Sequence, residues 1–254
     1  MEKGLLIKSY LKRLKLPTMA SLFERLAIEA SNNNHGYMDY LLALVEQEVL
    51  KREENAIKQR IKRAHFPVIK TLDSFDFSII PSVPKQKILQ LAQGEFVTRK
   101  ENIIFLGNPG TGKTHLAISI GYALCTLGKR VLFVTAAGIV NELMEANANL
   151  RLLKIQKQLQ KMDLIIIDEL GYVPFSREGA HLLFQLCSDL YERGSLIVTS
   201  NLDFTHWTEI FGEERLTGAL LDRLTHRAHI FPITGESYRF RQSLSLKKQS
   251  VKED

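Results

Sequence analysis

The segment Gly107-Asn108-Pro109-Gly110-Thr111-Gly112-Lys113-Thr114 has the residue types and spacing that suit a chain of phosphates. It fits the pattern G-x-x-x-x-G-K-[S/T] at every fixed position. Its glycines let the backbone curl so that successive N–H groups point at an anion, and the dipole of the following helix adds to this attraction. Lys113 can reach the β- and γ-phosphates, and the Thr114 hydroxyl can ligate Mg²⁺. The motif predicts binding of a nucleoside triphosphate together with Mg²⁺.

The surroundings of this loop suit the same role. An apolar run at 102–106 precedes it and a helix-like run at 116–124 follows it, which gives a strand, a loop and a helix in that order. We assign residues 107–115 to the nucleotide-binding segment. His115, in the first turn of the expected helix, is better suited to packing or capping than to a chemical step.

A second feature with chemical potential is an apolar strand, Leu164–Asp168, that ends in two carboxylates. At the carboxyl end of a parallel strand, Asp168 can hold Mg²⁺, and Glu169 can polarise an attacking water as a general base. The next apolar run ends in Asn201, whose amide can orient that water against the γ-phosphate. These residues predict hydrolysis. The alternatives are an ordinary acidic turn and a Ser-Asn turn opening.

From residue 85 onward, helix-like stretches alternate with short, wholly apolar runs. Such runs are typical of parallel strands that are covered on both faces. They predict an α/β fold, with a three-layer nucleotide-binding domain over 85–254 and a five-stranded parallel sheet. The expected strands are Ile103–Leu106, Val131–Thr135, Leu164–Asp168, Ser195–Ser200 and Ala228–Pro232.

Residues 1–70 read as a small all-helical domain, followed by an extended linker at 71–84 that contains Pro81 and Pro84. The helical part holds 13 Lys and Arg against 8 Asp and Glu, and so carries most of the formal net charge of +6. A basic appendage on a nearly neutral body favours an anionic partner, nucleic acid first, with a solvated surface as the alternative. No run approaches the roughly 18 apolar residues that span a bilayer. We therefore expect a cytoplasmic protein without a membrane partner.

Between the second and third expected strands, residues 136–163 leave room for two helices. Arg151, Lys154, Lys157 and Lys161 are spaced 3, 3 and 4 residues apart, which places them along one helical face. A row of cations at this pitch can follow a phosphate backbone, and the scarcity of aromatic residues favours duplex DNA without base readout. An ordinary solvated helix face is an equal alternative.

Several stretches together resemble a known family. Gly107–Thr114, Asp168-Glu169 and Thr199-Ser200-Asn201 look like the Walker A, Walker B and sensor 1 elements of AAA+ ATPases. More narrowly, 112–117, 168–172 and 220–227 are similar to the IstB-like transposition helper ATPases of bacterial insertion sequences, whose close relatives are the DnaC-like helicase loaders. The resemblance extends over nearly the whole chain, including the junction at 72–77.

This resemblance implies a bacterial ATPase that forms homo-oligomers on DNA, with ATP held between subunits, and that recruits or stimulates a transposase. Arg223 matches the arginine finger that reaches the γ-phosphate held by a neighbour, and Arg239 matches the sensor 2 arginine that contacts the nucleotide in cis. The planar guanidinium of arginine can donate several hydrogen bonds to phosphoryl oxygens at once, and it therefore suits them better than the single ammonium group of lysine does. A role of Arg223 as a helix-surface or salt-bridge residue stays open.

Two other functions stay open as well. A helicase loader would share the ATPase core and differ in the partner of its amino-terminal domain. A nucleotide-switched scaffold would bind ATP without hydrolysing it, and Glu169 and Asn201 argue against that function.

Overall fold

The computed structural model describes residues 2–235 and 237–238, which form two compact units that divide between Gln59 and Arg60. Arg239, the predicted sensor 2 residue, lies outside the described residues. Within the described part of the chain, no helix combines the length and the apolar character needed to cross a bilayer.

The first unit is helical. Its elements are α1 (Glu2–Arg13), α2 (Pro17–Asn32) and the first part of α3 (Tyr37–Arg63). Its small core contains Met19, Phe23 and Leu44. The buried Glu48 of α3 accepts hydrogen bonds from the backbone N–H groups of Thr18 and Met19 at 2.8 and 3.1 Å, and thereby satisfies the first turn of α2.

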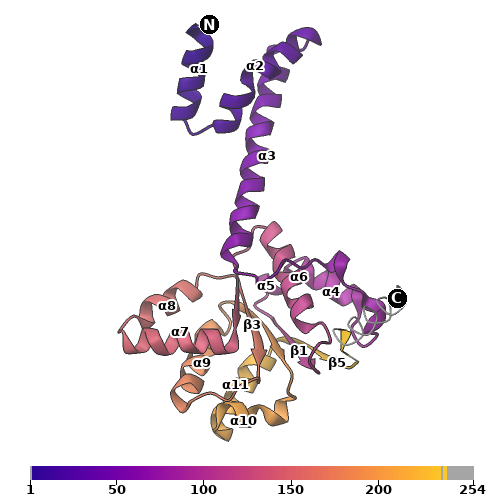
Figure 1. The fold of residues 1–254 in the computed structure, drawn as a ribbon, viewed down its shortest axis with the longest axis vertical. Coiled ribbons are helices and arrows are strands. Elements are labelled where there is room, and N and C mark those ends of the chain that lie inside the picture. Colours follow the sequence, from indigo (N-terminus) through magenta and orange to yellow (C-terminus); the bar gives the residue numbers. More distant parts are fainter. Residues whose placement is uncertain (1, 236, 239–254) are drawn as a thin grey trace, which may run out of the picture. The chain divides into compact units, whose positions relative to one another are not determined.

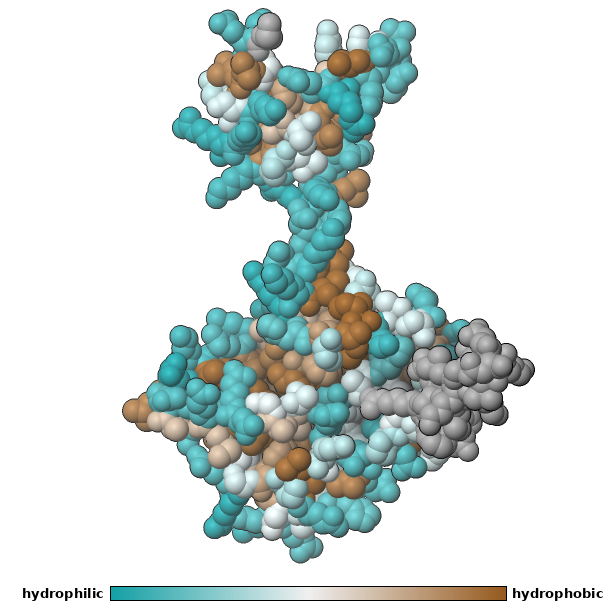
Figure 2. All heavy atoms as spheres, viewed as in Figure 1, coloured by the Kyte–Doolittle hydropathy of each residue, from teal (hydrophilic) through white to brown (hydrophobic). Residues whose placement is uncertain are grey.

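The charge of Glu48 is stabilised by these contacts. Burial raises the pKa of its carboxyl, but hydrogen bonds from the N–H of Met19, from Arg52 and from the N–H of Thr18 outweigh burial and hold the pKa below its usual value. Beyond Glu48, residues 51–55 of α3 are all exposed. Figure 2 shows hydrophilic side chains covering this stretch of the helix.

The second unit is an α/β domain (Figure 1). Its strands are β1 (Asn102–Gly107), β2 (Val131–Thr135), β3 (Leu164–Leu170), β4 (Ser195–Ser200) and β5 (Ala228–Ile233). Its α-helices are α4 (Lys85–Ala92), α5 (Glu95–Thr98), α6 (Lys113–Thr126), α7 (Ala136–Ala148), α8 (Leu152–Leu159), α9 (Arg177–Leu190), α10 (Trp207–Phe211) and α11 (Glu214–Thr225). Three short 3-10 helices are η1 (Leu72–Ser74), η2 (Phe77–Ile79) and η3 (Phe204–His206).

The five strands form one parallel sheet in the order β2-β3-β4-β1-β5. Side chains alternate between its faces, as in any strand. Ile104 of β1 and Ile165 of β3 pack with α7, α9, α10 and α11, whereas Ile103 and Ile166 pack with α4, α5 and α6. The predicted three-layer α/β fold with five parallel strands is confirmed.

The two units divide inside α3, at 59/60, and not at residue 70. The last turns of α3 belong to the second unit because two hydrogen bonds join them to it. Arg60 Nε donates to the carbonyl oxygen of Cys125 (2.9 Å), and the N–H of Phe133 donates to the carbonyl oxygen of Ala64 (2.8 Å). The segment expected to be an extended linker contains η1 and η2. Asp76 starts η2 by accepting a hydrogen bond from the N–H of Ser78 at 2.9 Å.

Candidate functional site

The predicted phosphate loop follows β1 directly and ends where α6 begins at Lys113. Lys113 is buried, and its Nζ donates to the carbonyl oxygens of Gly107 and Asn108 at 2.6 and 2.8 Å. The Thr111 hydroxyl donates to the same carbonyl of Asn108 at 2.8 Å. The loop is thus held in a closed curve around its lysine, at the N-terminus of a 14-residue helix.

A cavity of about 420 Å³ opens beside the loop, which is the size of a ligand pocket for a molecule such as a nucleotide. The loop supplies one wall and the segment 68–80 supplies another. Phe75 belongs to this second wall and lies against Gly112 and the ring of His115. The cavity is lined by Val68, Lys70, Ser74, Phe75, Asp76, Ile80, Gly110, Thr111, Gly112, Lys113, Thr114, His115, Ile118 and Tyr238.

His115 connects the two walls. Its Nε2 lies 3.2 Å from the carbonyl oxygen of Thr71 and 3.3 Å from the hydroxyl of Ser74, both in or next to η1. Burial lowers the pKa of His115, so the neutral imidazole is favoured near pH 7. His115 lines the cavity, and its contacts are those of a packing residue, as its position in the sequence indicated.

Asp168 lies at the carboxyl end of β3, where it is only 4% exposed. Its Oδ1 accepts a hydrogen bond from the Thr114 hydroxyl at 2.9 Å, so the two predicted Mg²⁺ ligands are in contact. A carboxylate oxygen and a hydroxyl oxygen at the edge of a phosphate loop are hard donors of the kind that Mg²⁺ takes alongside phosphate oxygens. The residues present fit that ion.

Glu169 is exposed, although it follows a buried aspartate in the same strand. Its φ of 62° is in the left-handed region, which side chains other than glycine rarely adopt. It borders a small hollow of about 90 Å³ with Thr135, Tyr172 and Phe175. The two carboxylates of the motif are therefore turned in different directions, one inward and one to solvent.

Asn201, just beyond the end of β4, brings a buried amide oxygen to this region. Among the described side chains, its Oδ1 is one of few buried polar atoms without a hydrogen-bond partner. It lies close to Gly171, where an added Cβ would stand 3.3 Å from it. A buried acceptor of this kind calls for a donor such as a water molecule or a ligand group.

Thr199 had no role of its own in the sensor 1-like stretch, yet its hydroxyl connects the Asp168 carboxylate to the backbone of Glu169. It donates to Asp168 Oδ1 at 2.5 Å and accepts the backbone N–H of Glu169 at 3.0 Å. One signal was present in the sequence: the apolar run Leu196–Val198 ends in a hydroxyl residue, Thr199, just before the end of a buried strand.

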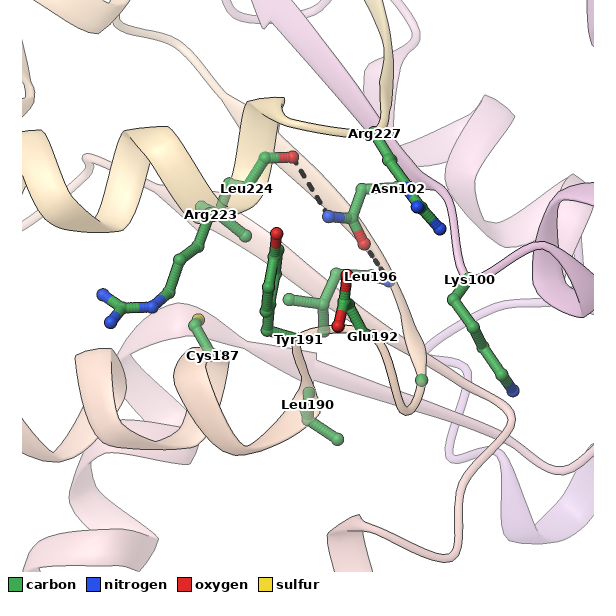
Figure 3. A pocket seen from close by; sticks show the side chains of 11 residues that line it. Lys100, Asn102, Cys187, Leu190, Tyr191, Glu192, Leu196, Arg223, Leu224 and Arg227 are labelled. Carbon is green, nitrogen blue, oxygen red and sulfur yellow. Dashed lines mark hydrogen bonds between the residues drawn. The ribbon is translucent and has the colours of Figure 1, made fainter.

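Arg223 lies at the other edge of the sheet from the phosphate loop. It stands near the end of α11, and the chain there meets the start of β1, where the N–H of Asn102 donates to the carbonyl oxygen of Arg227 (2.7 Å). The loop follows the opposite end of this strand, about 17 Å away at roughly 3.3 Å per residue. The Arg223 guanidinium stacks on the ring of Phe184, 4.8 Å from its centre. Figure 3 shows Arg223 and Arg227 directed away from each other beside Asn102.

The predicted row of cations does not lie along a single helix. Lys154 and Lys157 are on α8, but Arg151 precedes the helix as its N-cap and Lys161 follows its end. The helix covers only 152–159 because the turn at Leu150, with a φ of 56°, separates it from α7. The expectation of one helical face was wrong for Arg151 and Lys161. All four side chains are nevertheless exposed.

Comparison with known proteins identifies the family. The family model of the IstB-like ATP binding proteins matches residues 9–246. The chain belongs to this family.

Relatives within the family cover nearly the whole chain. An ATP-binding protein of insertion sequence IS5376 from Geobacillus stearothermophilus is 43% identical over 93% of this chain and 94% of its own length. One of insertion sequence IS21 from Pseudomonas aeruginosa is 40% identical over 91% of this chain and 88% of its own length. The IstB-like assignment made from the motifs is confirmed, and the chain is an ATP-binding protein of AAA+ type.

Solved structures of more distant proteins share the fold. A DnaC helicase loader covers 72% of this chain and 99% of its own, with a TM-score of 0.52 and 18% identity. AMPPCP-bound DnaA from Aquifex aeolicus covers 72% of this chain and 55% of its own, with a TM-score of 0.55 and 19% identity. At such identities the likeness concerns the AAA+ fold alone.

The contact between Gly112 and Phe75 generates a prediction about ATP binding. Gly112 has a φ of +96°, and an added Cβ would stand 2.8 Å from Phe75 Cε2. Gly112→Ala is therefore expected to displace the cavity wall and to weaken ATP binding by at least about tenfold, measured by titration with a fluorescent ATP analogue.

Gly128→Ala is the matched control. Gly128 also has a left-handed φ, +86°, but an added Cβ there meets nothing within 4 Å. This variant carries the same backbone strain without the clash, so its ATP affinity should stay near that of the unchanged protein. Equal ATP affinity of the two variants would contradict the role given to the Phe75 wall.

Proposed function

We propose that this protein is a Mg²⁺-dependent ATPase that assembles on duplex DNA and recruits or stimulates a transposase during DNA transposition. The observation that carries the hydrolytic part is the arrangement at the end of β3. There Asp168 is hydrogen-bonded to Thr114 of the phosphate loop, and Glu169 turns to solvent beside it. The relatives' description as insertion-sequence ATP-binding proteins supports the biological part.

In this proposal the phosphate loop holds the triphosphate, with Lys113 on the β- and γ-phosphates. Thr114 and Asp168 hold Mg²⁺, which when bound neutralises charge on the transferred phosphoryl group. Glu169 removes a proton from the attacking water, and the unpartnered amide oxygen of Asn201 accepts a hydrogen bond from that water. The role proposed for Arg239 rests on family resemblance.

Arg223 is proposed to act on the nucleotide of a neighbouring subunit. Its place at the amino-terminal edge of the sheet supports this, because the phosphate loop of the same chain begins at the opposite end of β1. ATP bound between subunits would join them, and hydrolysis would release the assembly from DNA.

The exposed cations at 151–161 are the proposed contact with the DNA backbone. Binding through phosphates alone is largely independent of sequence and weakens steeply with salt.

A helicase loader is the alternative with the same core. The gene next to this one separates the two: a transposase gene favours transposition, and a primosome gene favours helicase loading. A scaffold that binds ATP without hydrolysing it is a further alternative, which the first experiment below decides.

Glu169→Gln is expected to lower kcat for ATP hydrolysis by about a hundredfold or more, because general-base catalysis contributes factors of this size. Affinities for ATP and for DNA should stay unchanged, so the variant should remain in the DNA-bound assembly. Glu142→Gln, at an exposed carboxylate of α7, is the control and should hydrolyse ATP normally. Normal hydrolysis by the Glu169 variant would show that Glu169 is not the base.

A mixing experiment tests the action of Arg223 in trans. Arg223→Ala and Lys113→Ala subunits are each expected to be inactive alone. A mixture should recover part of the ATPase activity, because a Lys113→Ala subunit can still offer its Arg223 to the intact phosphate loop of its neighbour. If activity does not recover at any mixing ratio, Arg223 does not act in trans.

Replacing Arg151, Lys154 and Lys157 together by Ala is expected to weaken duplex binding and to reduce the slope of log K against log salt by about 2 to 3. ATP affinity should not change. The control replaces Gln158 and Gln160 by Ala, which are exposed residues at the end of the same helix and carry no charge. An unchanged salt slope in the triple variant would refute the contact.

A further inference from the structure

We propose that Thr199 is a positioning residue of the hydrolytic site, whose single hydroxyl fixes both the carboxylate of Asp168 and the backbone of Glu169. This inference deepens the proposed ATPase function and rests on it.

The first observation is an irregularity in the sheet between β3 and β4. Ile167 pairs with Val198 and Leu170 pairs with Ser200, so that two residues, Asp168 and Glu169, stand opposite Thr199 alone. An extra residue of this kind is a β-bulge, which bends the strand and redirects its side chains, and bulges are common next to active sites. Glu169 takes its left-handed φ of 62° within this bulge.

The bulge leaves a backbone group without its usual partner. In a regular ladder the N–H of Glu169 would donate to a carbonyl oxygen of β4. Here it donates instead to the Thr199 hydroxyl oxygen at 3.0 Å. An unpaired N–H at this position would be costly, and Glu169 already holds a strained φ of 62°. The hydroxyl therefore stabilises the backbone conformation that turns Glu169 outward.

The same hydroxyl holds Asp168. A threonine hydroxyl has one hydrogen to donate and two lone pairs that accept. Its hydrogen goes to Asp168 Oδ1 at 2.5 Å, while a lone pair takes the N–H of Glu169. Thr199 itself is 1% exposed, so solvent does not compete for these bonds. One side chain thus fixes the position of the proposed metal-binding carboxylate relative to the backbone of the neighbouring proposed base.

Thr199 differs in this respect from Thr114, which also donates to Asp168 Oδ1. Thr114 belongs to the phosphate loop and is itself a proposed Mg²⁺ ligand. Thr199 belongs to the sheet, and its hydroxyl is not itself a proposed ligand of the nucleotide or the metal, so it acts only through Asp168 and Glu169. The hydroxyl of Ser200, the next residue, is engaged with the backbone of Leu202 and supplies no second support.

The experiment compares Thr199→Val, which removes the hydroxyl, with Thr199→Ser, which removes only the methyl group. Thr217→Val is the control, at a threonine that is equally buried but bonds only to the carbonyl oxygen of Glu213 within its own helix region. Each variant is titrated with a fluorescent ATP analogue, with and without Mg²⁺, and kcat and KM for ATP are measured.

Thr199→Val is expected to bind nucleotide normally without Mg²⁺, because the phosphate loop is intact. Its gain in affinity on adding Mg²⁺ should fall by about tenfold, with a matching rise in KM for ATP, and kcat should fall by about 10- to 100-fold, as for residues that orient metal ligands. Thr199→Ser and Thr217→Val should stay within about threefold of the unchanged protein.

Two results would overturn the proposal. One is a Thr199→Val variant with an unchanged Mg²⁺ gain and an unchanged kcat. The other is a Thr199→Ser variant with kcat lowered more than tenfold, since that variant keeps the hydroxyl to which the proposal assigns the effect. The serine variant gives this answer even if the valine variant does not fold.

Combining Thr199→Val with Glu169→Gln separates this inference from the function on which it rests. If Thr199 acts on kcat through Glu169, the double variant should hydrolyse ATP hardly more slowly than Glu169→Gln alone, since residues that act together are not additive. Independent, multiplying losses in kcat would contradict the action through Glu169. Normal hydrolysis by Glu169→Gln would instead refute the assignment of Glu169 as the base. In that case the Mg²⁺ titration of Thr199→Val would still test whether the Thr199 hydroxyl positions the Asp168 carboxylate.

Discussion

A buried carboxylate is costly unless hydrogen bonds or a cation compensate for its lost hydration, and Asp168 meets this requirement with two hydroxyl donors. One donor, Thr114, comes from the first turn of α6 and the other, Thr199, from β4. Asp168 itself belongs to β3, which is the neighbour of β4 in the sheet. This carboxylate therefore joins α6, the helix after the phosphate loop, to both of these strands. A slip of one residue between β3 and β4 would turn Asp168 to the other face and undo both contacts.

Contacts hold α6, the helix that carries Lys113, along its whole length, so that it supports the phosphate loop rigidly. His115 attaches its first turn to the η1 segment. Phe66, just after the end of α3, packs close to Gly121 in its middle, where an added Cβ would stand 3.1 Å from the ring and 2.7 Å from Ile166 Cδ1. Arg60 then binds the carbonyl oxygen of Cys125 in the last turn. These contacts also explain why the end of α3 belongs to the second, α/β unit.

The sequence predicted the strands well and the details of the site less well, for physical reasons. Runs such as Ile103–Leu106 are apolar on both faces, and only a covered parallel strand suits them. The bulge at Asp168 and Glu169 was not predictable in this way, because it depends on the pairing of β3 with β4, which are distant in the chain. Two helices were expected in 136–163, but the second was drawn too long, because a spacing of three or four residues records a helical pitch and not where the helix begins after the left-handed turn at Leu150.

The separation of Arg223 from the phosphate loop follows from the topology of a parallel sheet. Each crossover helix returns the chain to the amino-terminal edge, so a residue near the end of α11, before β5, must lie at that edge. The loop follows β1 and must lie at the carboxyl edge. Substitutions that preserve the fold cannot bring the two together within one chain. If Arg223 contacts a γ-phosphate, that phosphate is bound by another copy, and hydrolysis then requires assembly.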